Sequence, residues 1–535
     1  MKNVRPAIRV ASLVVLLFSM AGCRKEQDAS RWDVDMLVPL VSSTLTIRDL
    51  VADSLVSTGT DGTVTLVFRD ELFAVDLDTL LNAPDTSFVY AYGLPVPGPL
   101  NFPAGFNFFS QSDVQRFDLG DVALRQLVLR EGRLEMRMKN KVASAVIGQF
   151  ALPGVVLPSG GNVLSTTVGA GTPSSPAYST DQRDLAGSSF DLRGPDYNSV
   201  NTLQTDLSAQ LDPAGTGATV TDQDSVVIEA RYSGLVPQYA KGYFGSRTEE
   251  VGPDTNALGL FDAIVGGTID LEDATLRLTV ENGLGADVRI AMRSLQAHNS
   301  RTGTTVDLTH SILNGPINLN RALDLGNGFT PSYYQTTVGA SNSNILDFLE
   351  CLPDRVSYAL DLWLNPLGDV SSGNDFLYYE SRLRADLELE VPLRLRADGL
   401  TLETFSRPDL PGSNEGHGLR SGTLRLFATN GFPMVGLVQL AIVDAEGNVL
   451  SEIPVQGSIP AGPLGPDGLV RSSATGELTA SLTPQQVDLL YQDTQLRTRV
   501  VLSTSTQTMY LRILESYALQ VQITAAFNYL VNGDE

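Results

Sequence analysis

The fold is decided by LREGRLEMRMKN (residues 129–140), LEDATLRLTVEN (271–282) and LRSGTLRLFATN (419–430), which are three copies of one phrase. Each copy has Leu at its first and sixth places, an apolar residue at every second place after that, and Asn at its end. Strict alternation places the apolar side chains on one face of a β-strand. The Asn is followed by Lys or Gly, which is turn chemistry because the Asn amide can bond to nearby backbone. Each copy therefore predicts a strand that runs into a turn.

The spacing of the copies predicts three domains. Asn140, Asn282 and Asn430 are 142 and 148 positions apart. This period is far longer than that of a solenoid, so each copy should have a core of its own. The 513 residues that remain without residues 1–22 lead to about the same number at roughly 150 residues per domain.

Two of the copies also predict a short helix that leads into a later strand. Residues 345–353 precede the strand-like stretch 356–362 in the second copy, and residues 487–491 precede 496–502 in the third. The corresponding region of the first copy contains only a strand-like stretch at 225–232.

Other alternating stretches make the whole body β-rich. Leu383–Leu395 has apolar residues at every odd position, and residues 517–527 alternate in a similar way. Strands with one solvated face pack best as two sheets around a common core. We therefore expect an all-β fold of about three tandem β-sandwich domains with few short helices. The repeated phrase resembles the opening strand of immunoglobulin-like or late-embryogenesis-abundant-like β-sandwiches.

The first 22 residues have the composition of an export signal. Lys2, Arg5 and Arg9 precede an apolar stretch at 10–18, and small residues precede Cys23. This stretch is shorter than the roughly 20 residues that a transmembrane helix needs. We expect residues 1–22 to be removed.

The residues before the cut suggest an anchor. Met20-Ala21-Gly22-Cys23 resembles the lipobox of bacterial lipoproteins, in which the cysteine thiol accepts diacylglycerol. The resemblance implies that Cys23 carries acyl chains such as palmitate, and two or three such chains anchor a protein stably. The alternative is a chance thiol after an ordinary secretory signal.

The start of the expected mature chain carries a second resemblance. Trp32-Asp33-Val34-Asp35 follows the cysteine closely, as in large outer-membrane lipoproteins of Bacteroidota. This resemblance implies a lipid anchor in the outer membrane, facing either the periplasm or the cell surface. It implies no activity.

The pattern predicts seven consecutive segments. They are a signal peptide (1–22), a tether (23–31), an N-terminal β-rich region (32–118), β repeat 1 (119–245), a linker (246–262), β repeat 2 (263–402) and β repeat 3 (403–535).

The net charge argues against one class of partner, and the cysteine content argues against a disulfide. Without residues 1–22, 34 Lys and Arg stand against 61 Asp and Glu, a net charge of −27. Such a surface repels nucleic acid, which we exclude as a partner. Once Cys23 carries lipid, only Cys351 remains, so no intramolecular disulfide is expected. Its apolar neighbours favour a buried structural thiol.

Motifs for catalysis or metal binding are weak. His298, His310 and His417 form no pair with zinc-ligand spacing, and no nucleophile elbow or phosphate-binding loop stands out. We therefore expect no cofactor and favour a non-catalytic protein. The best calcium candidates are Asp212, Asp222 and Asp224, because closely spaced oxygens suit a hard cation. A solvated turn is the favoured interpretation of these three residues.

One aromatic segment is a candidate contact for a partner. Phe102, Phe106, Phe108 and Phe109 lie in a stretch rich in Pro and Gly, and such loops lie on surfaces. Exposed rings can stack on sugars or anchor a protein. The alternative is that these rings fill the core.

Three functions remain open. The leading hypothesis is a lipid-anchored, non-catalytic envelope protein that binds or scaffolds another envelope protein or a glycan. The first alternative is a polysaccharide-active enzyme that uses loop carboxylates, which would need to lie about 5–10 Å apart in an open groove. The second alternative is a carrier of lipid or another apolar ligand, which would need an apolar cavity between the sheets.

Overall fold

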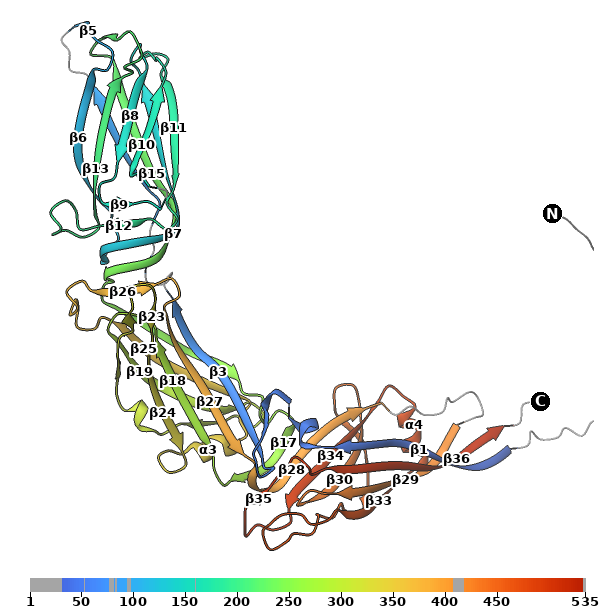
Figure 1. Cartoon of the computed structure of the whole chain (residues 1–535). Coiled ribbons are helices and arrows are strands. Elements are labelled where there is room, and N and C mark those ends of the chain that lie inside the picture. The colour runs from blue at the N-terminus through green and yellow to red at the C-terminus, as the bar shows by residue number, and fades with distance from the viewer. Residues whose placement is uncertain are drawn as a thin grey trace, which may run out of the picture.

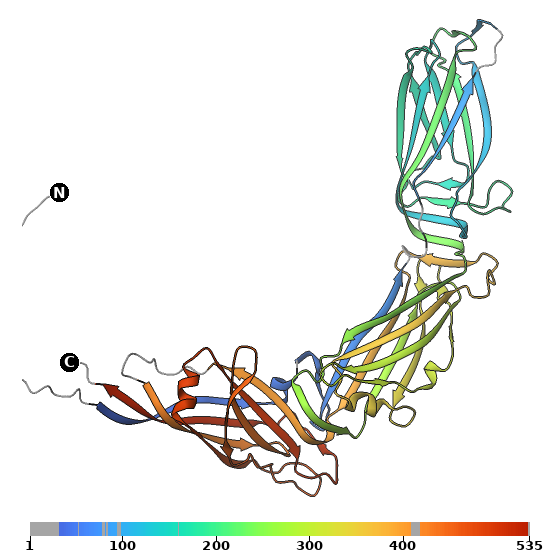
Figure 2. The same cartoon turned by 180° about the vertical axis from the view of Figure 1, so that it is seen from behind.

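The computed structural model describes residues 31–51, 53–76, 81, 84–93, 98–158, 160–407 and 418–532. Three β-sandwiches lie in a bent row, as seen from two sides (Figures 1 and 2). The base unit contains the first and last described strands, the middle unit follows, and the tip unit lies farthest from those strands. The prediction of an all-β chain of tandem β-sandwiches is confirmed.

The base unit consists of two sheets. The strands of its first sheet are, in order across the sheet, β1 (Arg31–Leu45), β36 (Leu519–Asn532), β29 (Gly418–Asn430), β33 (Ala474–Leu482) and β32 (Val455–Gln456). The strands of its second sheet are β17 (Ile264–Leu271), β28 (Arg394–Ser406), β34 (Gln495–Thr504), β30 (Met434–Val443) and β31 (Val449–Ile453), and β35 (Leu511–Arg512) also pairs with β28.

The middle unit is built in the same way. The strands of its first sheet are β2 (Val56–Thr58), β3 (Val64–Asp76), β27 (Arg382–Pro392), β18 (Thr275–Asn282) and β24 (Ser332–Gly339). The strands of its second sheet are β16 (Arg247–Ala257), β25 (Arg355–Leu364), β19 (Val288–Asn299) and β20 (Thr304–Asp307), and β21 (Ile317–Leu319) also pairs with β19. A small pair is formed by β22 (Leu323–Asp324) and β23 (Phe329–Thr330).

The tip unit has the longest strands. The strands of its first sheet are β26 (Asp375–Tyr378), β15 (Ser225–Tyr243), β7 (Ala123–Asn140), β12 (Ser189–Asp191) and β9 (Val155–Val156), with β4 (Thr86–Gly93) on β15 and β11 (Ala177–Asp184) on β7. The strands of its second sheet are β10 (Val163–Val168), β8 (Val146–Ala151), β13 (Thr202–Leu211) and β6 (Asn107–Arg116). At the far end, β5 (Leu100–Phe102) pairs with β14 (Ala218–Val220).

Helices are short and few in the described part of the chain. They are α1 (Ile47–Leu50), η1 (Asp53–Leu55), η2 (Ser311–Leu313), α3 (Ile345–Glu350) and α4 (Pro484–Leu490). The two predicted helices are confirmed, since α3 precedes β25 and α4 precedes β34. None of the helices described is long and apolar enough to cross a membrane.

The three sandwiches share one strand order. The first sheet contains β1-β36-β29-β33 in the base unit, β3-β27-β18-β24 in the middle unit and β4-β15-β7-β11 in the tip unit. The repeated phrase is therefore an interior strand each time. The register is also equivalent, because Asn430, Asn282 and Asn140 each lie opposite residues at the start of both neighbouring strands.

The terminal asparagine of each phrase is buried, and both polar atoms of its side-chain amide form hydrogen bonds. Asn140, Asn282 and Asn430 are between 0 and 3% exposed. Each Oδ1 accepts a hydrogen bond from the backbone N–H two residues later, at 2.8, 3.0 and 2.9 Å respectively. Each Nδ2 donates to backbone carbonyls of the turns that it holds together, among them Ser144, Asn320 and Met434. The amide thus satisfies backbone groups that the turn removes from the sheet ladder.

The N-terminal segment contributes a strand to every unit. Strand β1 pairs with β36, β3 with β27, and β4 with β15. The chain therefore runs from the base to the tip and then returns through the tip, middle and base units. This differs from the expectation of one N-terminal region at 32–118. The reason is that strand partners are set by tertiary contacts far along the chain.

The segment expected to be a linker, 246–262, contains strand β16. This strand pairs with β25 at the edge of the second sheet of the middle unit. None of its side chains is fully buried, so its sequence lacks the apolar alternation of an interior strand.

The units are joined by packing as well as by backbone. One connected cluster of buried apolar residues extends from Ile513 in the base unit through Leu360 in the middle unit to Phe150 in the tip unit. Strand β26 leaves the middle unit to pair with β15 of the tip unit. Two sandwiches joined by a single loop would lack both connections.

An ion pair with one buried partner reinforces the junction between the middle and tip units. The side chain of Asp375, at the start of β26, is 1% exposed and lies 2.8 Å from Nη1 of Arg321. Arg321 also contacts Asp287 at 2.7 Å through Nε. Burial raises the pKa of Asp375, and the hydrogen bond from Asn365 and the charge of Arg321 oppose this effect.

Replacing the asparagine of a phrase should destabilise its unit. We expect Asn140→Ala to lower the free energy of unfolding by about 2 kcal/mol, because it leaves buried backbone groups without partners. Urea denaturation followed by tyrosine fluorescence measures the change. Asn198→Ala, at an exposed position of the same unit, should be neutral, and equal effects of the two changes would contradict the role given to Asn140.

Candidate functional site

The phenylalanine segment lies at the far end of the tip unit. Phe102 ends β5, and Phe108 and Phe109 lie on β6. The rings of Phe102 and Phe106 stack with centroids 4.3 Å apart, and both meet Phe108 edge to face at 6.4 and 5.9 Å. Phe109 instead stacks on Tyr92 at 3.6 Å. The structure thus brings three of the four candidates together.

These rings are neither free nor fully buried. All four phenylalanines are half-buried and pack at the margin of the core. Leu100, which lies on β5 with Phe102, is 45% exposed. Because stacked rings hold one another in place, the tip presents a preformed apolar edge, which loses little conformational entropy when a partner covers it.

The three calcium candidates lie in turns. The carboxylate of Asp224 accepts hydrogen bonds from the backbone N–H and hydroxyl of Thr221 at 2.7 and 2.9 Å. Asp212 accepts from the backbone N–H of Ala214, and Asp222 is exposed. Across the described ranges, no three His, Cys, Asp or Glu side chains are grouped so that they could hold a metal ion.

A serine and a histidine are hydrogen-bonded on the outer face of the middle unit. Nε2 of His298 lies 2.6 Å from Oγ of Ser357, and Nδ1 lies 3.0 Å from the hydroxyl of Thr305. A nucleophile–base pair normally has a carboxylate on the second ring nitrogen. Here that partner is a hydroxyl, and the three residues lie on adjacent strands of a sheet face.

His310 and Cys351 both lie beside short helices of the middle unit. His310 caps η2 by accepting from the backbone N–H of Ile312 at 3.2 Å, and burial lowers its pKa. Cys351 is half-buried at the end of α3, and burial raises the pKa of its thiol. His417 and the lipobox residues Met20, Ala21, Gly22 and Cys23 lie outside the described residues.

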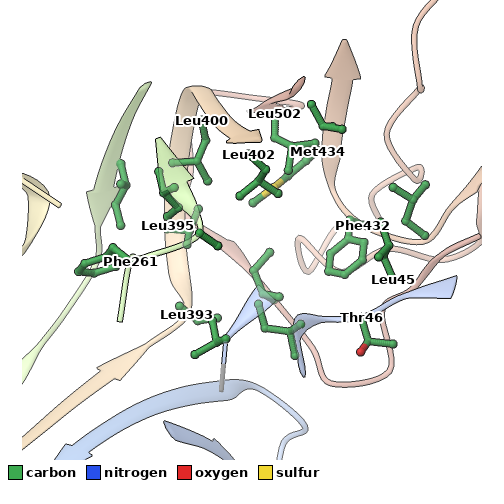
Figure 3. Close-up of a pocket in the computed structure, with 18 of the residues that line it drawn as sticks. Leu45, Thr46, Phe261, Leu393, Leu395, Leu400, Leu402, Phe432, Met434 and Leu502 are labelled. Atoms are coloured by element: carbon green, nitrogen blue, oxygen red, sulfur yellow. The ribbon is translucent and has the colours of Figure 1, made fainter. Parts of the chain in front are cut away.

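An apolar cavity lies between the sheets of the base unit, where that unit meets the middle unit (Figure 3). Its open volume is about 150 Å³. Leu45 comes from the end of β1, Phe261 from the connection before β17, Leu395 from β28 and Leu502 from β34. Three connections between the two units, at 46–55, 258–263 and 393, therefore contribute residues to its wall.

The chemistry of the cavity wall is almost wholly hydrocarbon. The polar residues on the wall are Thr46 and Asn430, and the amide of Asn430 is already used in its turn. A cavity of this volume holds about one benzene-sized group, whereas sites for larger ligands have about 300–1,000 Å³. The cavity fits a single ring or a short alkyl group, and a whole lipid would need more space.

Sequence reasoning did not find this cavity. Its residues come from segments hundreds of positions apart, and each reads locally as an ordinary apolar strand residue. Two of the crossings, near Leu45 and Phe261, lie in parts of the chain that were expected to belong to other domains.

No protein-family model matches the sequence, and comparison with curated proteins gives no match. A protein from Parabacteroides distasonis, provisionally described as secreted, is similar in structure with a TM-score of 0.26 and 12% identity, covering 52% of this chain and 82% of that chain. The Sulfolobus turreted icosahedral virus gives a TM-score of 0.11 at 11% identity, covering 86% and 97%. Broad bean stain virus gives 0.12 at 10% identity, covering 54% and 90%. Scores at this level establish neither a shared fold nor a function.

Partly filling the cavity should stabilise the base unit. We expect Val500→Leu, which adds one methylene at the cavity wall, to raise the free energy of unfolding by about 0.5–1 kcal/mol. Val501→Leu, on the opposite face of β34, is the matched control and should be neutral. Chemical denaturation measures both, and a loss of more than about 1 kcal/mol for Val500→Leu would indicate overpacking in place of free space.

Proposed function

We propose that this chain is a lipid-anchored, non-catalytic arm of the bacterial envelope, which holds a binding tip away from the membrane. The observation that carries the proposal is the path of the chain. Strand β1 begins at Arg31 and pairs with the last strand of the chain, whereas the phenylalanine cluster lies at the opposite end of the row of sandwiches (Figure 1).

The proposed anchor fits this path. The expected tether, from Cys23 to the start of β1, is only a few residues long, so lipid on Cys23 would hold the base unit against the membrane. The tip unit would then be the part of the chain farthest from the bilayer. We propose the outer membrane as the location, with the arm facing the periplasm or the cell surface.

The connections between the units support a rigid arm over three units that move independently. Each junction is crossed by the outgoing and returning chain, and apolar packing continues through it. Because such a body bends little, the distance from base to tip is set by the fold. A spacer of this kind is useful where a partner must be met at a fixed height above the membrane.

The tip supplies the binding chemistry in this proposal. Phe102, Phe106 and Phe108 form the half-buried apolar edge, and Leu100 extends it into solvent. Aromatic residues dominate the binding energy of many protein interfaces and also stack on sugars. The proposed partner is therefore another envelope protein or a glycan.

A second candidate function is the binding of a small apolar group in the base unit. The apolar cavity favours it, and its volume limits the ligand to roughly the size of one ring. Such a ligand would raise the melting temperature of the chain in proportion to its concentration above the dissociation constant.

The anchor is tested by removing its thiol. We expect Cys23→Ser to release the protein from sedimented membranes into the soluble fraction, because no acyl chain can then be attached. Cys351→Ser, which changes the other cysteine, should leave the protein in the membrane fraction. Membrane retention of the Cys23→Ser protein would contradict the lipid anchor.

The tip is tested by cross-linking in intact cells. A photoreactive residue at Asn101, which is exposed beside Phe102, should form a specific adduct with the partner. The double change Phe102→Ser and Phe108→Ser should abolish that adduct, because it removes the apolar edge. Thermal unfolding confirms that this variant is folded.

The matched control lies in the middle unit. Tyr333 is 63% exposed on β24, and Tyr333→Ser should leave the adduct unchanged. An adduct that survives the double change at the tip would rule out the phenylalanine cluster as the contact.

A further inference from the structure

A second hollow, which is polar, is lined by residues of β7, β12 and β15 and by Asn374 in the loop before β26. Figure 1 shows these strands at the lower end of the tip unit, next to β26. Lys241 on β15, Gln126 on β7 and Asp191 on β12 lie directly opposite one another across three adjacent strands. Residues paired in this way project from the same face of the sheet. Three neighbouring strands therefore each place a polar side chain in the hollow.

A β-bulge adds a fourth side chain. Lys241 lies opposite Gln126, but the next residue, Gly242, lies opposite Leu124, so Arg125 is an extra residue on β7. Leu124 is buried, whereas neither Arg125 nor Gln126 is. A bulge turns an additional side chain toward one face, and here it places Arg125 beside Gln126 on the wall of the hollow.

The position of Arg125 is fixed by a close approach of two backbones. A Cβ on Gly242 would meet the carbonyl oxygen of Ala123 at 2.3 Å, so only glycine fits opposite the bulge. A Cβ on Gly373 would meet Nε of Arg125 at 2.7 Å, which shows that the guanidinium rests against the loop before β26. The cation is thus held in place before any ligand arrives.

The hollow carries excess positive charge in an acidic protein. Its charged residues are Arg125, Arg193, Lys241 and Asp191. Arg193 pairs with Asp191 at 2.6 Å. Neither Arg125 nor Lys241 makes an ion pair with a residue that the structure describes, and Lys241 interacts with Asp324 only through space. Two cations without an ion-pair partner within the described residues, in a chain of net charge −24, form a local site for an anion.

We propose that this hollow binds an acidic saccharide unit, a sugar that bears a phosphate or a carboxylate. Arg125 and Lys241 would bind the anionic group, since a guanidinium and an ammonium both suit such oxygens. The uncharged residues of the wall are Ser189, Gln126, Asn374 and Phe190. The hydroxyl and amide groups of the first three both donate to and accept from sugar hydroxyls.

The size of the hollow favours a sugar over a bare anion. The open volume is about 380 Å³, within the range of about 300–1,000 Å³ found for small-molecule sites and far above what one inorganic anion fills.

Calorimetric titration of the full chain in detergent tests the proposal. The probes are glucose 6-phosphate and glucuronate. Glucose alone and inorganic phosphate alone are the controls, because each represents one part of glucose 6-phosphate. We expect saturable binding of the two charged sugars, no binding of glucose and at least tenfold weaker binding of inorganic phosphate. Raising the salt concentration should weaken the binding of both charged sugars.

Variants assign the binding to the hollow. Arg125→Gln and Lys241→Gln should each weaken binding of glucose 6-phosphate by about tenfold or more, the effect of losing one charge-assisted contact. Arg133→Gln removes the same charge from an exposed position of β7 and should have no effect. Because Arg125 also contacts Gly373 at the junction, its variant must keep the melting temperature of the unchanged protein. Lys241→Gln tests the hollow independently, at a residue that does not contact Gly373.

Several results would overturn the proposal. These are the absence of saturable binding by both charged sugars, affinities for inorganic phosphate equal to those for glucose 6-phosphate, and binding that neither Arg125→Gln nor Lys241→Gln weakens. None of these outcomes bears on the anchor or on the phenylalanine tip, so the two proposals can fail separately.

Discussion

The structure depends on the pairing of the outgoing strands β1, β3 and β4 with the returning strands β36, β27 and β15. Strands β36, β27 and β15 would each present an unpaired edge if β1, β3 and β4 did not cover them. An open edge of this length promotes pairing with other chains. One N-terminal segment covers all three edges, and other backbone hydrogen bonds cross the junctions, namely Val64 N–H to the carbonyl of Ile513 and the pairing of β26 with β15. The same pairing places both described ends of the chain at the base, and contacts of such high sequence separation should make folding slow.

Much of the fold could be predicted from local sequence because its repeating element is local. Alternation in the phrase at 129–140 and its two copies determines which face of a strand is buried, and the terminal Asn determines where that strand turns. The N-terminal strands could not be assigned in this way. Strand β1 differs from an ordinary β-rich stretch only in its partner, which lies almost 500 positions later. Strand β16 was interpreted as a linker because an exposed edge strand has no apolar period.

The candidate sites were less predictable, for a related reason. The phenylalanine loop was visible because its residues are close in sequence, and three of its four rings are together in space. The cavity near Leu502 and the hollow around Arg125 are assembled from distant segments. In a regular strand, Arg125 and Gln126 would project from opposite faces. Only the bulge places both in one hollow, and no pattern in the sequence marks it.

Both hollows lie at junctions between sandwiches, and the path of the chain explains why. Within a sandwich, two twisted sheets pack closely and leave little space. Strands leave one unit for the next at the junctions, as β17 and β28 do between the middle and base units and β26 does between the middle and tip units. Side chains from two units meet there and can leave space between them. The lining of each gap then depends on which residues cross. The chain is apolar where it passes between units near Leu45 and Phe261, so the cavity there is apolar. At the other junction Arg125 and Lys241 line the hollow, so that hollow is charged. In an arm built from repeated sandwiches, specificity can therefore differ from one junction to the next while the sandwiches themselves stay the same.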